Sequence, residues 1–434
     1  MKYYSTNKQS ELVDFKKATI NGQAPDKGLY FPKTIPEVDN DFFNGIETFS
    51  NEEIAFRVIK PFVSDTIPDE HLYKIVSETI NFSIPLVQVN ENIFSLELFH
   101  GPTLAFKDVG ARFMSRCLSY FLKDQKKKVI ILVATSGDTG GAVANGFYGV
   151  DGVEVVILYP SGKVSPIQEK QLTTPGENIH ALEVQGTFDD CQQMVKQAFG
   201  DKEINEKLFL TSANSINVAR WLPQQFYYFF AYKQWPDKKN PPVISVPSGN
   251  FGNIAAGLLA MRSGLPVTHF IAACNANDVF INYLQTGSYQ NKKAIATISN
   301  AMDVGDPSNF VRISEIFNHD FSELKRHLSA YSISDEETLA TIKQVYQQYN
   351  YLQDPHGAVG YLSLHRYLEK HRAGKGLFLE TAHPSKFPEA VEKIIGEKIE
   401  IPSAVENIMK KTKQSTLMKV DYALLKDHLL KNNS

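Results

Sequence analysis

Two glycine-rich segments directly follow runs of apolar, β-branched residues, and both carry polar side chains. The first spans residues 135–141 (TSGDTGG) after 129–134, and the second spans 248–253 (SGNFGN) after 243–247. Glycines permit a tight turn that points several amide N–H groups at one place, and a following helix adds the positive end of its dipole. Such loops bind phosphate or carboxylate, although ordinary strand-to-helix turns can have the same composition. Neither segment is G-x-G-x-x-G or carries G-K-[ST], which argues against a nicotinamide dinucleotide site and an ATPase.

A lysine lies at the expected start of a long helix, within residues 100–108 (HGPTLAFKD). Lys107 is surrounded by apolar neighbours, among them Leu104 and Phe106. A free lysine has a pKa of ~10.4 and is almost fully protonated at pH 7. A nucleophilic lysine therefore needs burial, a nearby positive charge or covalent attachment to a carbonyl cofactor. The alternative is a lysine whose stem packs at the helix start while its ammonium group reaches solvent.

Three further polar segments end or begin expected elements: residues 211–217 (TSANSIN), 354–357 (DPHG) and 380–384 (ETAHP). The hydroxyl of Thr381 could hydrogen-bond a ring nitrogen, but a plain strand end accounts for its segment equally. The other two segments are interpreted as helix N-caps. The common signatures of serine hydrolases and zinc proteases, G-x-S-x-G and H-E-x-x-H, do not occur, and no metal site is expected.

Composition favours a globular protein without a polyanionic partner. The chain has 434 residues, with 45 basic and 48 acidic side chains and a net charge of −3, so binding of nucleic acid through counterion release is not expected. One basic cluster, Lys123 with Lys126 to Lys128, is interpreted as a solvated helix end. Three dispersed cysteines favour a reducing compartment, and no apolar run approaches the ~20 residues of a membrane helix. We expect a cytoplasmic protein without a membrane segment.

Fully apolar strands alternate with helices through most of the chain, which predicts parallel sheets covered by helices on both faces. The first 85 residues are expected to be mostly helical, with Ser50 and Glu53 at capping-box spacing, and so are residues 275–350 and the last 40. Both glycine-rich loops would then lie at carboxyl ends of strands, where open α/β sheets bind ligands. The expected strands are 93–98, 129–135, 153–159, 179–184, 208–211, 243–246, 268–274 and 376–380. The expected helices include 69–80, 107–122, 141–148, 166–172, 188–199, 218–235 and 253–262.

Taken together, five motifs resemble those of threonine synthases of the bacterial and fungal class. They are FHGPTLAFKD (99–108), ATSGDTG (134–140), YPSGKVSPIQ (159–168), SGNFGN (248–253) and TAHPSKF (381–387). The resemblance implies the tryptophan-synthase-β-like fold of pyridoxal-phosphate enzymes, fold type II, with two open and mostly parallel sheets. The division that we expect has a helical segment at 1–85, a large domain from 86–116 and 212–390, a small domain at 117–211, and a helical tail at 391–434.

The resemblance also implies a role for particular residues. Lys107 would form the Schiff base with pyridoxal 5′-phosphate, and Thr381 would face the pyridine nitrogen. The cofactor phosphate would lie on Gly249, Asn250, Phe251, Gly252 and Asn253. Asp138, where enzymes outside this class usually have Asn, would approach the cofactor, and Thr135, Ser136 and Thr139 would hold the substrate carboxylate. Candidates for the substrate phosphate are Arg112, Lys163, Ser215 and Asn217, followed by Asn309 and Arg312.

The activity that the resemblance implies is release of phosphate from O-phospho-L-homoserine and addition of water, which yields L-threonine. Three alternatives remain at this point: a related enzyme such as a serine/threonine dehydratase, a family member that binds without turnover, and a simple nucleotide-binding module. Release of phosphate with threonine as the product would distinguish a threonine synthase from a dehydratase. A yellow protein that borohydride bleaches would exclude a simple nucleotide-binding module. The oligomeric state is left as monomer or dimer.

Overall fold

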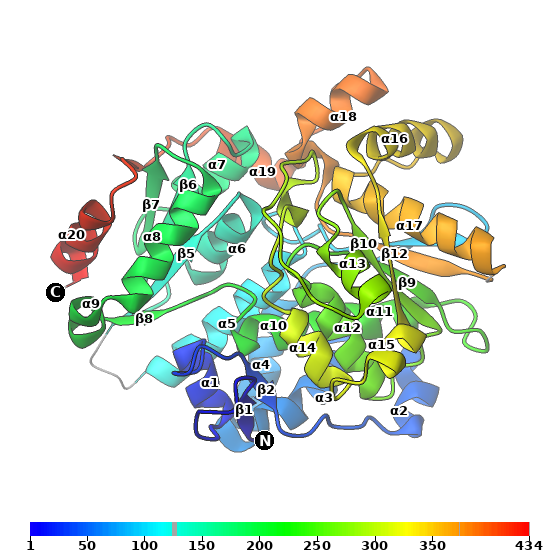
Figure 1. Ribbon diagram of the computed structural model, residues 1–434, viewed down its shortest axis with the longest axis horizontal. Coiled ribbons are helices and arrows are strands. Elements are labelled where there is room, and N and C mark those ends of the chain that lie inside the picture. Colours follow the sequence, from blue (N-terminus) through cyan, green and yellow to red (C-terminus); the bar gives the residue numbers. More distant parts are fainter. Residues whose placement is uncertain (124–127, 373, 434) are drawn as a thin grey trace.

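Two mostly parallel sheets form the core among the described residues, and the smaller of them has five strands, all parallel, in the order β13-β7-β6-β5-β8. The structure is a computed structural model that describes residues 1–434 apart from 124–127, 373 and 434; Lys126 and Lys127 of the basic cluster thus lie outside the described residues. Figure 1 shows this sheet on the left, with helix α8 across it. Its strands are β5 (Val129–Ala134), β6 (Val153–Pro160), β7 (Ile179–Val184), β8 (Phe209–Thr211) and β13 (Thr416–Met418).

The larger sheet has six strands in the order β11-β10-β9-β12-β4-β3. All neighbours are parallel except β3 and β4, which are antiparallel. A separate two-stranded antiparallel sheet joins β1 (Tyr3–Ser5) to β2 (Tyr30–Pro32). The strands of the larger sheet are β3 (Leu86–Gln88), β4 (Ile93–Glu97), β9 (Val243–Pro247), β10 (His269–Cys274), β11 (Leu328–Ser332) and β12 (Gly376–Glu380).

Helices cover both sheets and form most of the first 80 residues, which lie along the lower edge of Figure 1 in blue. Helix α5 leads from the larger sheet to the smaller one, because it follows β4 and precedes β5. The helices up to β9 are α1 (Phe15–Asn21), α2 (Asn40–Gly45), α3 (Asn51–Val63), α4 (Asp69–Thr79), α5 (Lys107–Leu122), α6 (Asp138–Phe147), α7 (Pro166–Thr173), α8 (Phe188–Gly200), α9 (Lys202–Lys207), α10 (Val218–Trp221) and α11 (Phe226–Gln234). Those after β9 are α12 (Gly252–Arg262), α13 (Val279–Thr286), α14 (Phe310–Ile316), α15 (Phe321–His327), α16 (Asp335–Tyr349), α17 (Pro355–His371), α18 (Pro388–Ile395), α19 (Ser403–Met409) and α20 (Tyr422–Asn433).

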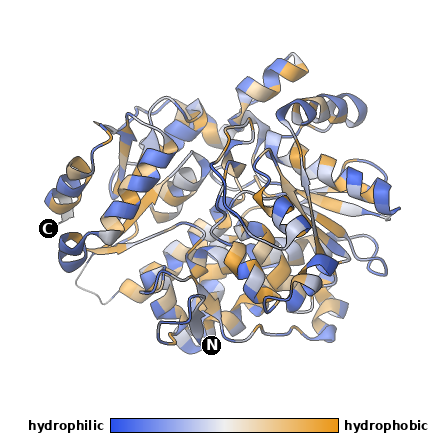
Figure 2. Ribbon diagram, viewed as in Figure 1, coloured by the Kyte–Doolittle hydropathy of each residue, from blue (hydrophilic) through white to orange (hydrophobic). Residues whose placement is uncertain are grey.

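The expected fold class is confirmed, and burial explains why its strands were recognisable. Every residue of β5, β9, β10 and β12 is buried, as helices on both faces of a parallel sheet require. In Figure 2 the strands are largely orange, whereas the outer helix α16 is mostly blue. Among the described residues, no helix is long and apolar enough to cross a membrane.

Local chemistry sets several helix ends. Ser50 accepts a hydrogen bond from the amide of Glu53 at 3.1 Å and so caps α3. The reciprocal bond of a capping box is not found among the described residues, because the Glu53 side chain pairs with Arg57. The expected single helix over 218–235 is wrong, because it is divided into α10, a 3-10 turn at Leu222–Gln225 and α11. Pro223 has no N–H to donate to the preceding turn, which interrupts the α-helical ladder.

Several short strands were not expected from the sequence. β1, β2 and β3 fall within or next to the segment expected to be helical, and β11 falls within 275–350. Each has three to five residues, too few for a period of two to stand out. β11 is recognisable only from its partner, because it forms the edge of the larger sheet against β10.

The expectation that residues 391–434 form a peripheral helical tail needs correction. The segment contains β13, which pairs with β7 and extends the smaller sheet. Leu425 and Leu429 of α20 are fully buried in the core of that sheet. Figure 1 shows α20 in red beside α8 and α9, far along the chain but adjacent in space. The last helix therefore forms part of the covering layer of the smaller sheet.

Candidate active site

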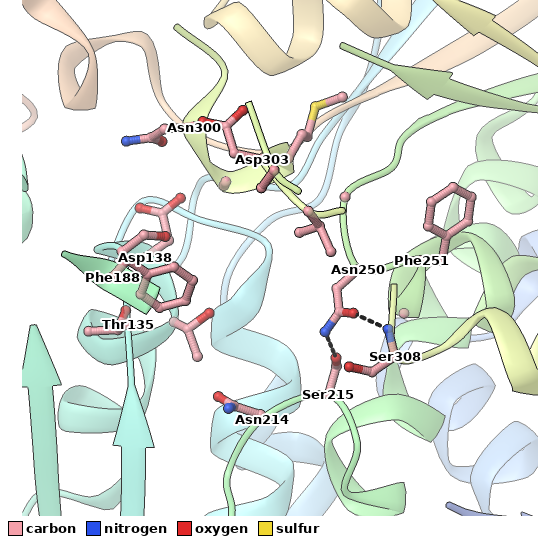
Figure 3. Close-up of a pocket in the computed structure, with 18 of the residues that line it drawn as sticks. Thr135, Asp138, Phe188, Asn214, Ser215, Asn250, Phe251, Asn300, Asp303 and Ser308 are labelled. Atoms are coloured by element: carbon pink, nitrogen blue, oxygen red, sulfur yellow. Dashed lines mark hydrogen bonds between the residues drawn. The ribbon is translucent and has the colours of Figure 1, made fainter. Parts of the chain in front are cut away.

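A cavity of about 490 Å³ lies where the carboxyl ends of β5, β9 and β12 meet. Both sheets contribute to its lining, as expected for ligand sites in open α/β sheets. In Figure 3, Thr135, Asp138 and Phe188 lie on one side, and Asn250, Ser215 and Ser308 on the other. The cavity brings together most of the residues proposed from the sequence: Lys107, Thr135, Ser136, Asp138, Thr139, Ser215, Gly249, Asn250, Phe251, Gly252, Asn253 and Thr381.

Lys107 is the first residue of α5, and its side chain is 17% exposed. The nearest carboxylate oxygen is Oδ2 of Asp138, 3.9 Å from the lysine Nζ. Burial lowers the pKa of Lys107, the charge of Asp138 raises it, and the charge of Lys386 lowers it again. A lowered pKa increases the neutral fraction of the amine, which is the form that attacks a carbonyl. The reading of Lys107 as a snorkelling surface lysine is therefore not supported by its placement.

Asp138 is buried and held by two donors at the same oxygen. Lys386 Nζ lies 2.6 Å from its Oδ1, and Gln168 Nε2 donates to that atom at 2.9 Å. Although burial raises the pKa of Asp138, the charges of Lys386 and Lys107 and these hydrogen bonds hold it well below its usual value. Lys386 is fully buried and also donates to the carbonyl of Thr103 at 2.8 Å. Asp138 is thus an ionised carboxylate with a partner of its own, and Lys107 is not its principal counterion.

The loop at 248–253 has the features of an anion cradle. A Cβ on Gly249 would lie 2.6 Å from Met302 Cα and 2.8 Å from the carbonyl oxygen of Ala301, so only glycine fits there. Phe251 precedes α12 in the left-handed region, with φ of 60°. The first amides of α12 have no acceptor inside the helix and carry the positive end of its dipole.

Asn253 adds a donor to this cradle. Its Oδ1 accepts from the hydroxyl of Tyr228 at 2.8 Å, which fixes the orientation of the amide. Its Nδ2 is buried and has no hydrogen-bond partner among the residues that the structure describes. A buried donor without an acceptor is costly unless a ligand supplies one. Together with Gly249 and the amides of α12, this orphaned donor fits a bound phosphate.

Thr381 follows β12 and is tied to the peptide just before Lys107. The amide of Phe106 donates to the carbonyl of Thr381 at 2.9 Å, and Ala105 and Ala382 form an isolated antiparallel bridge. The threonine side chain and the lysine therefore enter one cavity from adjoining backbone segments.

Several residues proposed for the substrate phosphate do not line the cavity. Arg112 donates to the carbonyl of Thr79 at 3.2 Å and to Asn81 Oδ1 at 2.8 Å, at the end of α4. Lys163 lies in the turn after β6 and is not among the cavity-lining residues. These two basic side chains are directed elsewhere by the helix and turn that carry them.

The remaining proposed residues have structural partners. Asn217 caps α10 and donates to the carbonyl of Thr19 at 2.9 Å. Arg312 is fully buried and donates to the carbonyls of Ser215 and Ile216, both at 2.7 Å. Asn309 donates to Ser215 Oγ at 2.9 Å, behind the cavity wall. These contacts make the three side chains supports of the 215–217 turn, not parts of the lining.

Arg220 lines the cavity but was not proposed from the sequence. It is 4% exposed, and its Nη1 donates to the carbonyl of Ala213 at 2.7 Å. Within the described part of the chain, its Nε is buried without a hydrogen-bond partner. Burial lowers the pKa of this guanidinium to about 10, so it stays charged at neutral pH. No ion pair of Arg220 with a carboxylate is found among the described residues, and a buried cation in this position fits an anionic ligand. The sequence signal that could have indicated Arg220 is its position five residues after Ser215. An arginine inside an apolar helix is, however, equally consistent with a purely structural role.

Three family models match the chain, and two of them overlap at residues 357–380. "Pyridoxal-phosphate dependent enzyme" covers residues 82–380, "Threonine synthase N terminus" covers 2–80, and "Threonine synthase, C-terminal" covers 357–429. The threonine synthase of Haemophilus influenzae is 43% identical over 433 residues, with all of both chains covered. That of Escherichia coli is 45% identical over 403 residues, with 93% of each chain covered.

Solved structures agree with these matches. Threonine synthase from Escherichia coli has a TM-score of 0.93 at 42% identity, with both chains fully covered. Threonine synthase from Brucella melitensis, described as bound to PLP, has a TM-score of 0.93 at 35% identity, with 100% of this chain and 99% of that chain covered. Maize serine racemase, at 17% identity and a TM-score of 0.54 over 72% of this chain and 93% of its own, shares the fold alone. The chain belongs to the threonine synthase family of pyridoxal-phosphate-dependent enzymes.

Proposed function

We propose that this chain catalyses the threonine synthase reaction, in which O-phospho-L-homoserine and water yield L-threonine and inorganic phosphate. The observation that carries the proposal is the largely buried lysine at the start of α5. It shares one cavity with a phosphate cradle and with a second cation, Arg220, which has no carboxylate ion pair among the described residues. The full-length likeness to threonine synthases supports the same reaction. A serine/threonine dehydratase is not favoured, because its substrates have no phosphate group that could occupy a second anion site at Arg220.

Pyridoxal phosphate fits the residues that are present. We infer that the amides near Gly249 to Asn253 hold its phosphate, that Lys107 bonds its aldehyde carbon, and that Thr381 and Asp138 face its ring. When bound, pyridoxal phosphate supplies an aldehyde that links covalently to an amine and a conjugated ring that stabilises negative charge on the substrate. All further tasks fall to side chains of the chain itself.

We assign proton transfer to Lys107. Its amine has a lowered pKa, so once released from covalent attachment it can accept a proton at Nζ and return it. Asp138 does not take that proton, because Lys386 keeps its carboxylate in the charged form. The positive charge of Lys386, fixed beside Asp138, favours return of the proton from Lys107.

We assign the anionic ends of the substrate to two walls of the cavity. Thr135, Ser136 and Thr139 follow β5 and suit a carboxylate. Ser215 lies on the other side. Together with Arg220, which also lines the cavity, it suits the leaving phosphate, for which a guanidinium is a strong partner. Because residues from both sheets enclose this space, approach of the two sheets around the substrate would exclude bulk water. We further propose a cytoplasmic location and a monomeric or dimeric state.

A direct assay tests the proposal. The purified chain loaded with pyridoxal phosphate is incubated with O-phospho-L-homoserine, and phosphate and amino acids are measured together. Equal amounts of phosphate and L-threonine are expected. Release of a ketoacid and ammonia without threonine would assign the chain to the dehydratases. If neither phosphate nor any new amino acid or ketoacid forms, the chain is a binding protein without turnover.

A further inference from the structure

His356 lies in the wall of the same cavity, and none of the roles above involves it. It is the second residue of α17 and is 2% exposed. Its Nδ1 is 2.6 Å from Oδ1 of Asp354, which is fully buried. Since a carboxylate only accepts hydrogen bonds, Nδ1 carries the proton and Nε2 is left as an acceptor. That acceptor is used, because the amide of Ala301 donates to Nε2 at 3.2 Å.

Asp354 fixes the orientation of the imidazole through the contact of its Oδ1 with Nδ1. Its other oxygen, Oδ2, accepts from the amide of Ala382 at 3.1 Å, and Oδ1 also accepts from the amide of His356. Ala382 directly follows Thr381 in the chain. One carboxylate therefore joins the end of β12, the start of α17 and the ring of His356.

Ala301 belongs to a segment that we call the strap, residues 297–304, which contains one short 3-10 turn at Asn300–Met302. Asn275 Nδ2 donates to Ser299 Oγ at 3.1 Å and to Asp303 Oδ1 at 2.9 Å, which ties the strap to the end of β10. Figure 3 shows Asn300 and Asp303 of the strap above the cavity. The strap therefore supplies the upper wall of the space available to a substrate.

The strap rests directly on the phosphate loop. A Cβ built on Gly249 would lie 2.6 Å from Met302 Cα and 2.8 Å from the carbonyl oxygen of Ala301, so the two backbone segments are in direct contact. An amide at the start of a 3-10 turn has no acceptor within the turn, so His356 Nε2 supplies the acceptor that Ala301 needs. Backbone contact with Gly249 sets how deep the strap lies, and the bond to His356 sets where along the cavity it is held.

We propose that His356 is a positioning residue for substrate binding, which holds the strap through the amide of Ala301 while Asp354 fixes its ring. The proposal rests on the proposed function for its substrate. Without the acceptor at Nε2, the strap has more conformations in the absence of substrate, and substrate must order it on binding. The expected consequence is a higher KM with little change in kcat, because His356 acts through the strap and is assigned no part in proton transfer.

Two substitutions separate the two nitrogens of the ring. In His356→Asn the amide nitrogen can occupy the place of Nδ1 and keep the contact with Asp354, but nothing reaches Ala301. In His356→Gln the amide oxygen can occupy the place of Nε2 and accept from Ala301. We expect His356→Asn to raise KM for O-phospho-L-homoserine about tenfold or more, with the absorption spectrum of the bound cofactor unchanged, and His356→Gln to restore a KM near that of the parent. Equal KM values for both variants, whether raised or not, would overturn the proposal.

A second variant covers the case in which His356→Asn does not fold. Ala301→Pro removes the donor itself, because proline has no backbone N–H, and it should raise KM as His356→Asn does. A KM at the parent value in Ala301→Pro would overturn the proposal.

Amide hydrogen exchange of the full chain, with and without pyridoxal phosphate, gives a readout that does not depend on turnover. We expect exchange at residues 299–303 to be faster in His356→Asn than in the parent and in His356→Gln. Unchanged exchange would contradict the role of His356. A parent chain that releases no phosphate would instead contradict the proposed function and leave the exchange result to decide on the strap.

Discussion

Lys386 Nζ lies 2.6 Å from Oδ1 of Asp138, and neither side chain is exposed to more than a few per cent. Lys107 Nζ lies 3.9 Å from the other oxygen of the same carboxylate. Lys386, which makes the short contact, does not line the cavity, whereas Lys107, which makes the long one, does. Because Asp138 is neutralised by Lys386, the amine of Lys107 is left available for covalent chemistry.

The buried pair should carry a large share of the stability of this region. Asp138→Asn leaves Lys386 as an uncompensated buried charge, and breaking such a pair typically costs about 3–5 kcal/mol. We expect a loss of this size in the free energy of unfolding, measured in urea on protein without cofactor. Asp151→Asn, an exposed residue, is the control and should stay within about 0.5 kcal/mol of the parent.

Addition of Lys386→Met to Asp138→Asn removes the orphaned charge and should recover part of the loss. If the single and double variants were equally unstable, the stability of this region would not depend on the unpaired lysine.

Glu380 gives a pH dependence of defined sign. The residue is fully buried, and burial followed by the charge of Asp354 raises its pKa well above the ordinary value. The folded state therefore keeps a proton that the unfolded chain releases above pH ~4.3, so Glu380 makes the free energy of unfolding fall as pH rises through this window. Glu380→Gln should be more stable relative to the parent at pH 8 than at pH 4. Thermal unfolding across this range measures the difference, and an unchanged difference would mean that Glu380 is ionised.

Lys107→Ala should abolish covalent attachment of the cofactor. Borohydride treatment followed by mass spectrometry should find pyridoxyl label on residue 107 of the parent and none on the variant, and turnover should fall by about 10²–10⁴ or more. Lys207→Ala, a surface lysine paired with Glu203, should retain both properties. Label at another lysine of the parent would displace Lys107 from the role assigned to it.

Gly249→Ala tests the phosphate cradle. The added Cβ would meet backbone atoms of Met302 and Ala301 at under 3 Å, so either the loop or the strap must move. We expect the dissociation constant of pyridoxal phosphate, measured by absorbance titration, to rise about tenfold or more. Gly200→Ala is a matched control because a Cβ there meets no atom within 4 Å. Equal affinities of the two variants would place the cofactor phosphate elsewhere.

Arg220→Lys tests the second anion site. Lysine keeps a charge but loses the planar fork of the guanidinium, so KM for O-phospho-L-homoserine should rise about tenfold, equivalent to ~1.4 kcal/mol. Inhibition by inorganic phosphate should weaken in parallel, which links the effect to the phosphate group. Arg116→Lys, at the surface beside Glu78, should leave both values unchanged. A changed kcat with unaltered KM and phosphate inhibition would assign Arg220 to another task.

The sequence by itself determined the parts of this protein that depend on local pattern. Continuous apolar runs such as Val129–Ala134 mark strands buried on both faces, so the α/β class and its long strands could be predicted. The glycine-rich loops at 135–141 and 248–253 and the apolar neighbours of Lys107 are each visible within a few consecutive residues. These parts of the site could therefore be predicted from the sequence.

Only the tertiary structure decided which polar side chains meet. Arg112 and Arg220 are both basic residues on helices, yet Arg112 turns to the end of α4 and Arg220 into the cavity. Lys386 and His356 act on residues 248 and 55 positions away in the chain, through contacts with Asp138 and the amide of Ala301. The direction of a side chain depends on the packing of the whole helix that carries it, and a periodicity read along one segment does not contain that information.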